Sequence, residues 1–352
     1  MTTKLAEHYI ISLFSRDKKL TAKQLELIGV GRRTPSILYT IERKQLFSLY
    51  GLFPKWNEKM WMRIINDFTK RKWLIVDNGE AFLSEEGERQ KTAFIMPDRS
   101  LPDIKSIEYA KTRSVFWERF VFISQILSEF SYNNNQYLPH LPSAEDQRQT
   151  KLWIKQQGLP MKELTRQWAE EIASYLESLP VSYANMLVDQ LMGNEENGLT
   201  RRQLLEKFAM TESDYKVLMT HLLESFRLYS LNHDLALIQN LWSSIHVQES
   251  KGLNKSAYET LHLIEMGHTI DEIARLRHLK ENTIIEHLLE IVLVTHWPGY
   301  KAFIPDDAYA MIHHCFEDKP DLTYGEFKLD HPDIPFFWFR LIEIERIRAH
   351  AY

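Results

Sequence analysis

Residues 254–292 read NKSAYETLHLIEMGHTIDEIARLRHLKENTIIEHLLEIV, and this stretch decides the fold of the carboxy-terminal region. Gly267 follows the first segment of apolar periodicity, where the end of a helix favours a left-handed backbone. Thr269, with Glu272 three residues later, has the capping-box spacing that begins a second helix. After a turn at 277–281, apolar residues recur at helical spacing over 282–292. The pattern predicts a helix-turn-helix whose last helix could lie in a DNA major groove.

The charge of this stretch departs from that of a typical groove-binding helix. Residues 255–300 contain four Lys+Arg and seven Asp+Glu, and helical spacing places Glu281, Glu286 and Glu290 on the exposed side of the last helix. Carboxylates repel phosphates, so both direct DNA contact and docking on a protein stay open. Lys280 also stands where a Ser or Thr N-cap is usual. The candidate DNA contacts of this element are Arg275, Arg277, Lys280 and Asn282.

The composition of the whole chain is that of a mostly helical globular protein. Its 352 residues predict two or three domains, and 12 Gly and 13 Pro are too few for Gly-rich phosphate loops or a turn-rich all-β fold. The single cysteine, Cys315, excludes an internal disulfide framework and fits a reducing compartment. No uncharged apolar run approaches the roughly 18 residues of a membrane span. We therefore expect a cytoplasmic, nucleoid-associated protein without membrane contact.

Positive charge is concentrated towards the amino-terminal end. Residues 1–119 contain 22 Lys+Arg and 15 Asp+Glu, whereas the rest of the chain contains 21 and 33. A cationic end suggests a surface that faces a polyanion. The alternative is the ordinary variation of charge between the segments of a helical protein.

Residues 1–95 show the order of elements of a winged helix. Asn78-Gly79, between short apolar runs at 73–76 and 81–83, is a strong signal for a two-residue hairpin turn. A predicted helix over 58–72 precedes the hairpin and Ser84 begins another helix after it; in winged helices the preceding helix often enters a groove. The candidate DNA contacts are Arg32, Arg33, Arg43, Lys44, Lys59, Arg63, Lys70, Arg71 and Lys72. One alternative is that residues 70–72 only complement the negative end of the helix dipole. Another is that the domain binds a protein rather than DNA.

The middle of the chain, residues 96–250, is predicted to be helical. Thr200 and Thr211 each begin a short helix, and this pair resembles a degenerate helix-turn-helix. Ordinary helix packing with ordinary caps is the favoured interpretation of the pair.

Sequence motifs for catalysis and for metal binding are absent. The chain contains no G-x-x-x-x-G-K-[ST], G-x-G-x-x-G, G-x-S-x-G or H-E-x-x-H. His313, His314 and Cys315 are adjacent, so on a helix they point in different directions and cannot share one metal ion. We expect neither an enzyme nor a cofactor.

Residues 258–292 resemble the helicase helix-turn-helix domain found at the carboxyl end of many bacterial RecQ-type DNA helicases. The resemblance is carried by Ile273-Ala274, Leu279, Thr283-Ile284 and His287-Leu288. Residues 322–327 occupy the place of that domain's short closing helices. In length and layout the chain is similar to the YpbB family of Gram-positive bacteria, which are stand-alone proteins whose genes lie beside a RecQ-like helicase.

We therefore predict a mainly α, multi-domain protein. The predicted domains are a winged-helix-like domain over 1–95, a helical middle domain over 96–250 and a helicase helix-turn-helix domain over 252–352. The resemblance implies a non-catalytic DNA-binding accessory protein of a RecQ-type DNA helicase in DNA repair or recombination, with duplex or single-stranded DNA as the shared ligand. A sequence-specific transcription regulator and a protein-interaction scaffold without DNA contact are the alternatives.

Overall fold

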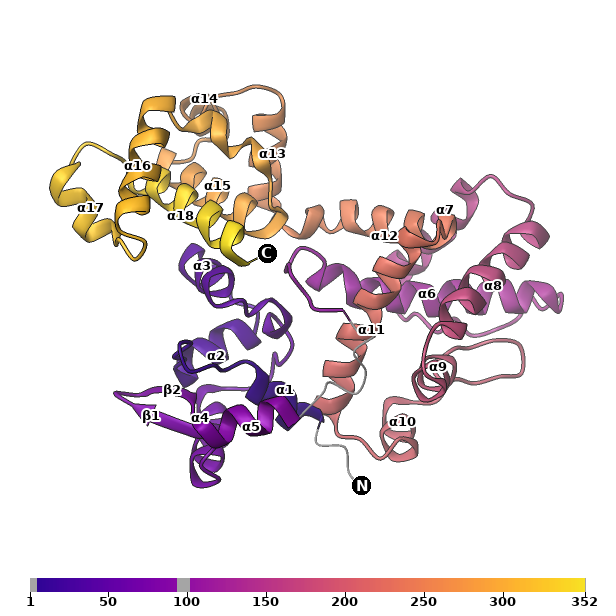
Figure 1. Ribbon diagram of the computed structural model, residues 1–352. Coiled ribbons are helices and arrows are strands. Elements are labelled where there is room, and N and C mark those ends of the chain that lie inside the picture. Colours follow the sequence, from indigo (N-terminus) through magenta and orange to yellow (C-terminus); the bar gives the residue numbers. More distant parts are fainter. Residues whose placement is uncertain (1–4, 94–101, 352) are drawn as a thin grey trace. The chain divides into compact units, whose positions relative to one another are not determined.

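The computed structural model describes residues 5–93 and 102–351, and this part of the chain is mainly helical with one two-stranded sheet (Figure 1). It divides into two compact units, each built from separate stretches of sequence. The first unit comprises 1–19, 65–104 and 109–249, and the second comprises 20–64, 105–108 and 250–352. The division into domains 1–95, 96–250 and 252–352 stays a prediction, and its boundary between residues 95 and 96 lies outside the described residues.

The first unit is built mostly from the middle of the chain. Its elements are α1 (Leu5–Ser12), β1 (Leu74–Asp77), β2 (Glu80–Leu83), α5 (Glu85–Ala93), α6 (Ala110–Ser131), α7 (Ala144–Gln156), α8 (Met161–Glu177), α9 (Val181–Val188), α10 (Arg201–Lys207), α11 (Glu212–Asn232) and α12 (Ala236–Gln248). The helix α4 (Glu58–Lys70) begins in the second unit and ends in the first.

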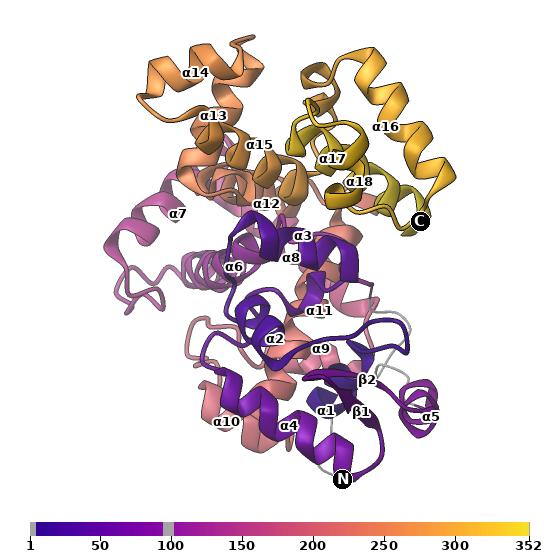
Figure 2. The same cartoon turned by 90° about the vertical axis from the view of Figure 1, so that its left-hand side faces the viewer.

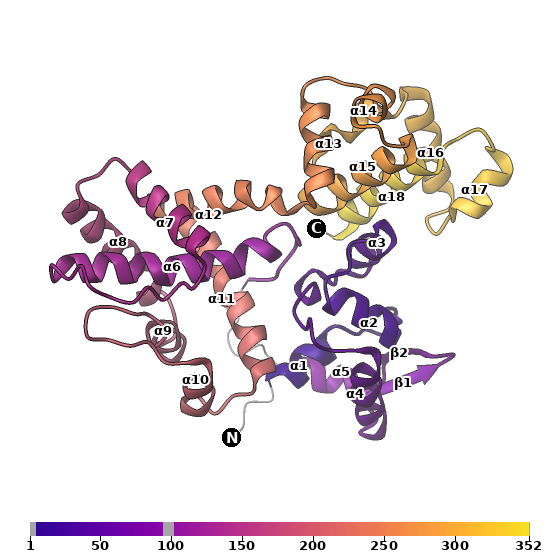
Figure 3. The ribbon, with the colours of Figure 1, turned by 180° about the vertical axis from the view of Figure 1, so that it is seen from behind.

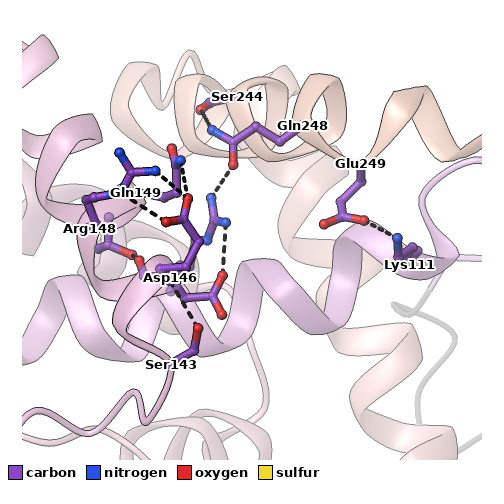
Figure 4. Close-up of polar contacts among 11 residues, drawn as sticks. Lys111, Ser143, Asp146, Arg148, Gln149, Ser244, Gln248 and Glu249 are labelled. Atoms are coloured by element: carbon purple, nitrogen blue, oxygen red, sulfur yellow. Dashed lines mark hydrogen bonds and ion pairs between the residues drawn. The ribbon is translucent and has the colours of Figure 1, made fainter. Parts of the chain in front are cut away.

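Buried aromatic rings form the core of the first unit where α6, α8, α11 and α12 pack together. The rings of Phe116 and Trp242 stack with centroids 3.8 Å apart, and those of Tyr175 and Phe226 stack at 4.2 Å. Polar contacts connect α6 with α7 and α12 (Figure 4). The buried Arg119 of α6 donates to Gln248 of α12 at 2.5 Å and to Asp146 of α7 at 3.3 Å.

The β1–β2 hairpin forms as the Asn-Gly signal predicts. Asn78 and Gly79 have φ of 49° and 80°, and the antiparallel register pairs Asp77 with Glu80. Leu74 and Leu83 are buried at one end of the hairpin, whereas Ile75 and Val76 of β1 are exposed. Figure 3 shows the hairpin extending away from α5.

Gly87 is the position in this region where only glycine fits. A Cβ atom built on it lies 2.0 Å from the backbone oxygen of Trp73, because α5 approaches the residue before β1 closely. We expect Gly87→Ala to lower the free energy of unfolding by about 1–3 kcal/mol, the usual cost of overpacking. Gly325→Ala is the control, since its Cβ meets only the Thr323 Oγ1 atom at 3.9 Å. Urea denaturation of both variants checks this, and an equal stability of the two would contradict it.

The second unit combines a short amino-terminal stretch with the carboxy-terminal region. Its elements are α2 (Ala22–Gly29), α3 (Pro35–Lys44), η1 (Phe47–Leu49), η2 (Ser250–Gly252), α13 (Lys255–Glu265), α14 (Ile270–Arg277), α15 (Glu281–Thr295), η3 (Pro298–Phe303), α16 (Asp306–Asp318), α17 (Tyr324–Asp330) and α18 (Phe336–Ala351). α15 is its central helix and packs against α13, α14, α3 and α18 (Figure 2).

Two buried ion pairs join α3 and the turn before it to the carboxy-terminal helices. Glu42 of α3 is 1% exposed and receives hydrogen bonds from Arg348 Nε and Nη2 at 2.9 and 2.8 Å. Arg33 donates from Nε and Nη2 to Glu290 of α15 at 3.1 and 2.8 Å. Each pair connects residues more than 250 positions apart, so the amino-terminal stretch is an integral part of this unit.

Candidate nucleic-acid interface

The helix-turn-helix forms with the local contacts that its sequence predicts. Gly267 has φ of 90° just after α13, and its N–H donates to the Ile264 carbonyl at 2.9 Å. In α14 the Thr269 N–H donates to Glu272 Oε2 at 2.9 Å, and the Glu272 N–H donates back to Thr269 Oγ1 at 3.3 Å. Lys280 is the N-cap residue of α15 and makes no capping bond with its side chain. The start of α15 therefore has no side-chain cap.

Only the first two turns of α15 are open to solvent. Glu281, Asn282 and Glu286 are exposed, and every residue from His287 to Val294 is buried. Glu290, which helical spacing placed on the exposed side, is 4% exposed and is bonded to Arg33 and to the Asn254 N–H at 2.9 Å. That expectation was wrong because α15 is surrounded by neighbouring helices. The part of α15 that could reach a groove is short and acidic.

Two of the four predicted contacts in this element serve the fold or pair locally. Arg277 donates to the Ser256 carbonyl at 2.6 Å and to Glu259 at 2.7 Å, so its side chain, 13% exposed, is held against α13. Burial, together with the Arg277 charge, lowers the pKa of the neighbouring His287 imidazole. Arg275 is exposed and pairs with Asp271 of the same helix at 2.6 Å. Lys280 and Asn282 are exposed beside them.

The predicted contacts in α3 and before it have different environments. Arg33 is held by Glu290 and donates to the Gly252 carbonyl at 2.8 Å, which makes it a structural residue of the second unit. Arg32 and Arg43 are exposed. Arg43 and Lys44 form the last turn of α3, where positive charge also complements the helix dipole.

α4 presents a cationic stripe along one face, which we call the α4 stripe and define as Lys59, Arg63 and Lys70. The spacings of four and seven residues place all three on the same side of this helix. They are exposed, and within residues 5–93 and 102–351 none of their side chains makes a hydrogen bond or ion pair. Trp61 and Phe68 are buried on the opposite face. The stripe is therefore free to meet phosphates.

The three cationic residues at the end of α4, Lys70, Arg71 and Lys72, have different surroundings. Arg71 pairs with Glu7 at 3.0 Å and with Asp67 at 2.6 Å, and its guanidinium lies 5.0 Å from the ring centroid of Trp73. The hydrogen bond with Glu7 raises the pKa of Arg71. Lys72 is exposed with a left-handed backbone, φ of 62°. Arg71 therefore anchors α4 to α1, while Lys70 and Lys72 face solvent.

The described residues show neither a metal cluster nor a membrane helix. Within 5–93 and 102–351, no three His, Cys, Asp or Glu side chains gather closely enough to hold a metal ion. Burial raises the pKa of the lone Cys315 thiol, whose Sγ lies 3.8 Å from His331 Nε2. None of the described helices combines the length and the apolar character that a membrane crossing requires.

Comparisons with known proteins agree with the resemblance seen in the sequence. Residues 256–342 match a family model described as a helix-turn-helix domain. Protein YpbB of Bacillus subtilis (strain 168) is 26% identical over 196 residues, an alignment that covers 54% of this chain and 53% of YpbB. The aligned part thus spans about half the length of that curated relative. No solved structure matches the chain.

Proposed function

Since the chain is a distant homologue of YpbB and carries a carboxy-terminal helix-turn-helix domain, we propose that it is a non-catalytic, DNA-binding accessory protein of a RecQ-type DNA helicase. Such a protein would act on the nucleoid, in the cytoplasm, during DNA repair or recombination. Helix-turn-helix domains are typical of DNA-binding proteins. The helicase partner is proposed from the resemblance to the carboxy-terminal domain of RecQ-type helicases.

The observation that carries the DNA-binding proposal is the α4 stripe. Its three cations are exposed and unpaired within the described residues, and a phosphate backbone is the ligand that such a row attracts. The helix is followed by the β1–β2 hairpin, which has the order of a recognition helix and a wing. We propose on this basis that residues 1–95 act as a winged helix. In this proposal the α4 stripe and Lys72 contact phosphates.

The stripe can be tested by reversing its charge. We expect the triple variant Lys59→Glu, Arg63→Glu, Lys70→Glu to lose most affinity for a plain 20-base-pair duplex and for a single strand. Each lost phosphate contact should reduce the slope of log affinity against log salt by about 0.9 on duplex DNA. Fluorescence anisotropy between low and moderate salt measures both quantities. Arg71 is left unchanged because its ion pairs belong to the fold.

A matched control variant reverses three lysines elsewhere. Lys151, Lys155 and Lys162 of α7 and α8 are exposed, and their side chains are unpaired within the part of the chain that the structure describes. Their reversal changes net charge equally and should leave the salt slope unchanged. An equal loss in both variants would mean that only net charge matters and would contradict the proposal. Binding to a single promoter sequence would favour a transcription regulator, and no binding at any salt concentration would favour a scaffold.

The helicase link has its own test. The full chain, immobilised, should retain the RecQ-type helicase encoded in the same genome at low salt, with and without nuclease treatment. Retention that disappears after nuclease treatment would show a bridge of DNA rather than a protein contact. No retention under either condition would remove the helicase from the proposal and leave DNA binding to be judged by the salt titration.

A further inference from the structure

A cleft of about 600 Å³ opens beside the exposed end of α15, and we call it the α15 cleft. This volume is within the roughly 300–1,000 Å³ of ordinary ligand sites. The cleft is bounded by the end of α13, the starts of α14, α15 and α18, and η3. Its apolar lining consists of Ile264, Ile270, Ile285, Trp297, Phe303 and Phe337.

Most of this apolar lining is accessible to solvent. Ile264 is buried, whereas the other five side chains are partly exposed. Contiguous exposed apolar surface is costly in water and is typical of interaction sites. An apolar side chain bound in the cleft would remove this surface from water and so gain binding free energy.

Gly299 holds one wall of the cleft in position. A Cβ atom at Gly299 would lie 2.2 Å from the indole ring of Trp297, so the absent side chain lets the ring fold against the backbone. The ring of Trp297 is also tilted towards that of Phe303, with centroids 6.3 Å apart. The aromatic wall is therefore built into η3 and is present without a ligand.

The rim of the cleft is acidic where a DNA-reading helix would be basic. Glu281 lies on the rim and is exposed at the start of α15. Within the described residues the Glu281 carboxylate forms no hydrogen bond or ion pair. Asp271, also on the rim, is paired with Arg275. Base edges are contacted by the first residues of a reading helix, and Glu281, the first residue of α15, repels phosphate.

We infer that the α15 cleft binds a basic polypeptide segment that inserts one or two bulky apolar side chains, with a lysine or arginine of the segment meeting Glu281. The inference rests on the proposed function in that the helicase is the expected source of the segment. Charge complementarity selects the basic segment, and the apolar lining requires the anchor. This helix-turn-helix would then bind protein with the start of its last helix, the part that DNA-binding helix-turn-helix domains place against DNA.

Three labelled peptides test the cleft on the full chain. They are KRKLFKRK, KRKSSKRK and EDELFEDE, all with blocked ends, and binding is measured by fluorescence anisotropy. We expect the first peptide to bind at least about tenfold more tightly than either of the others, since it alone offers both charge and anchor. Equal binding of KRKSSKRK would show charge attraction only, and no binding of KRKLFKRK would also overturn the inference.

Two variants place the binding in the cleft. Ile285→Lys puts a cation among the apolar lining, and Glu281→Lys reverses an exposed rim charge without touching the core. Each should weaken KRKLFKRK binding at least about tenfold. Leu276→Lys is the matched control, because Leu276 is an exposed apolar residue of α14 outside the cleft, and it should leave binding unchanged. Thermal melting shows which variants keep the fold. If Ile285→Lys unfolds, the peptide affinity of Glu281→Lys alone tests whether the peptide binds at the cleft.

The same variants separate this inference from the proposed function. If the wild-type chain, Ile285→Lys and Glu281→Lys all retain the helicase equally, the helicase does not bind at the α15 cleft. The inference would then be overturned, and the proposed function would stand. Peptide binding at the cleft without any helicase retention would leave the cleft standing and remove the helicase from the proposed function. Duplex DNA affinity should be the same in wild type and Ile285→Lys. A severalfold rise in the variant would show DNA at this face and contradict a protein occupant.

Discussion

Replacing Arg348 with Met should lower the free energy of unfolding of the second unit by about 3–5 kcal/mol. Glu42 is almost completely buried, and both of its oxygens accept hydrogen bonds from Arg348. Arg348 Nη2 also donates to the Val292 carbonyl of α15 at 3.0 Å. Met keeps the volume and removes the charge, so the variant leaves a buried carboxylate without its partner. Urea denaturation, with hydrogen exchange of α3 and α18 peptides as the local readout, measures the loss.

Two further variants show whether the pair or the side chain alone matters. Arg346→Met is the control on the same helix, since Arg346 is only partly buried and donates one long bond, 3.4 Å, to the Pro320 carbonyl. The double variant Glu42→Met, Arg348→Met removes both charges and should recover most of the lost stability, as replacing a buried pair with apolar residues often does. A loss in Arg348→Met no greater than that in Arg346→Met would contradict the role assigned to the pair.

Features that depend on neighbouring residues could be predicted from the sequence. The capping boxes begun by Thr200, Thr211 and Thr269 all form, with both reciprocal bonds in place. The hairpin turn at Asn78-Gly79 also forms, because both residues tolerate positive φ. In each case a few consecutive side chains satisfy the backbone locally, so a single sequence contains the whole signal.

Features that join distant segments could not be predicted in the same way. The packing of α3 against α15 and α18 depends on complementary surfaces, and no periodicity reveals which helix will cover another. One signal was present and was missed. Residues 288–294 read LLEIVLV, so α15 is apolar on all sides there and a carboxylate at Glu290 must be buried and paired. Its partner, Arg33, was predicted as a DNA contact because charge alone does not distinguish a buried cation from an exposed one.

In the candidate interface, too, local features could be predicted from the sequence and features that join distant segments could not. Lys59, Arg63 and Lys70 could be predicted as one face because helical spacing fixes their side. Their contact with DNA stays a prediction. The α15 cleft was not foreseen, since its walls come from helices separated by up to about 70 residues and only the fold brings Ile264, Ile285 and Phe337 to one cavity.

The carboxy-terminal stretch of the second unit, which contains the predicted domain 252–352, should not be stable when it is cut out of the chain. Residues 250–352 expressed alone lose α3, which covers part of α15 and α18. They also lose Arg33 and Glu42, so that Glu290 and Arg348 lose the oppositely charged groups that pair with them. Breaking a fully buried pair costs about 3–5 kcal/mol, and the fragment also loses the apolar cover that α3 gives α15 and α18. The stability of a typical domain is only about 5–15 kcal/mol, so these losses take away a large part of it. We expect thermal unfolding followed by circular dichroism to be broad and low for this fragment.

Restoring the amino-terminal stretch should restore cooperative unfolding. A fusion of residues 20–64 to residues 250–352 through a flexible Gly/Ser linker contains both ion pairs and the helix that covers α15. The same fusion carrying Arg33→Met and Glu42→Met keeps the apolar cover and lacks both pairs, so it distinguishes lost burial from lost charge partners. A fragment 250–352 that unfolds as cooperatively and at the same temperature as the fusion would show that the helix-turn-helix domain is complete without α3. The buried charges Glu290 and Arg348 would then have to be neutralised by contacts that the second unit does not use.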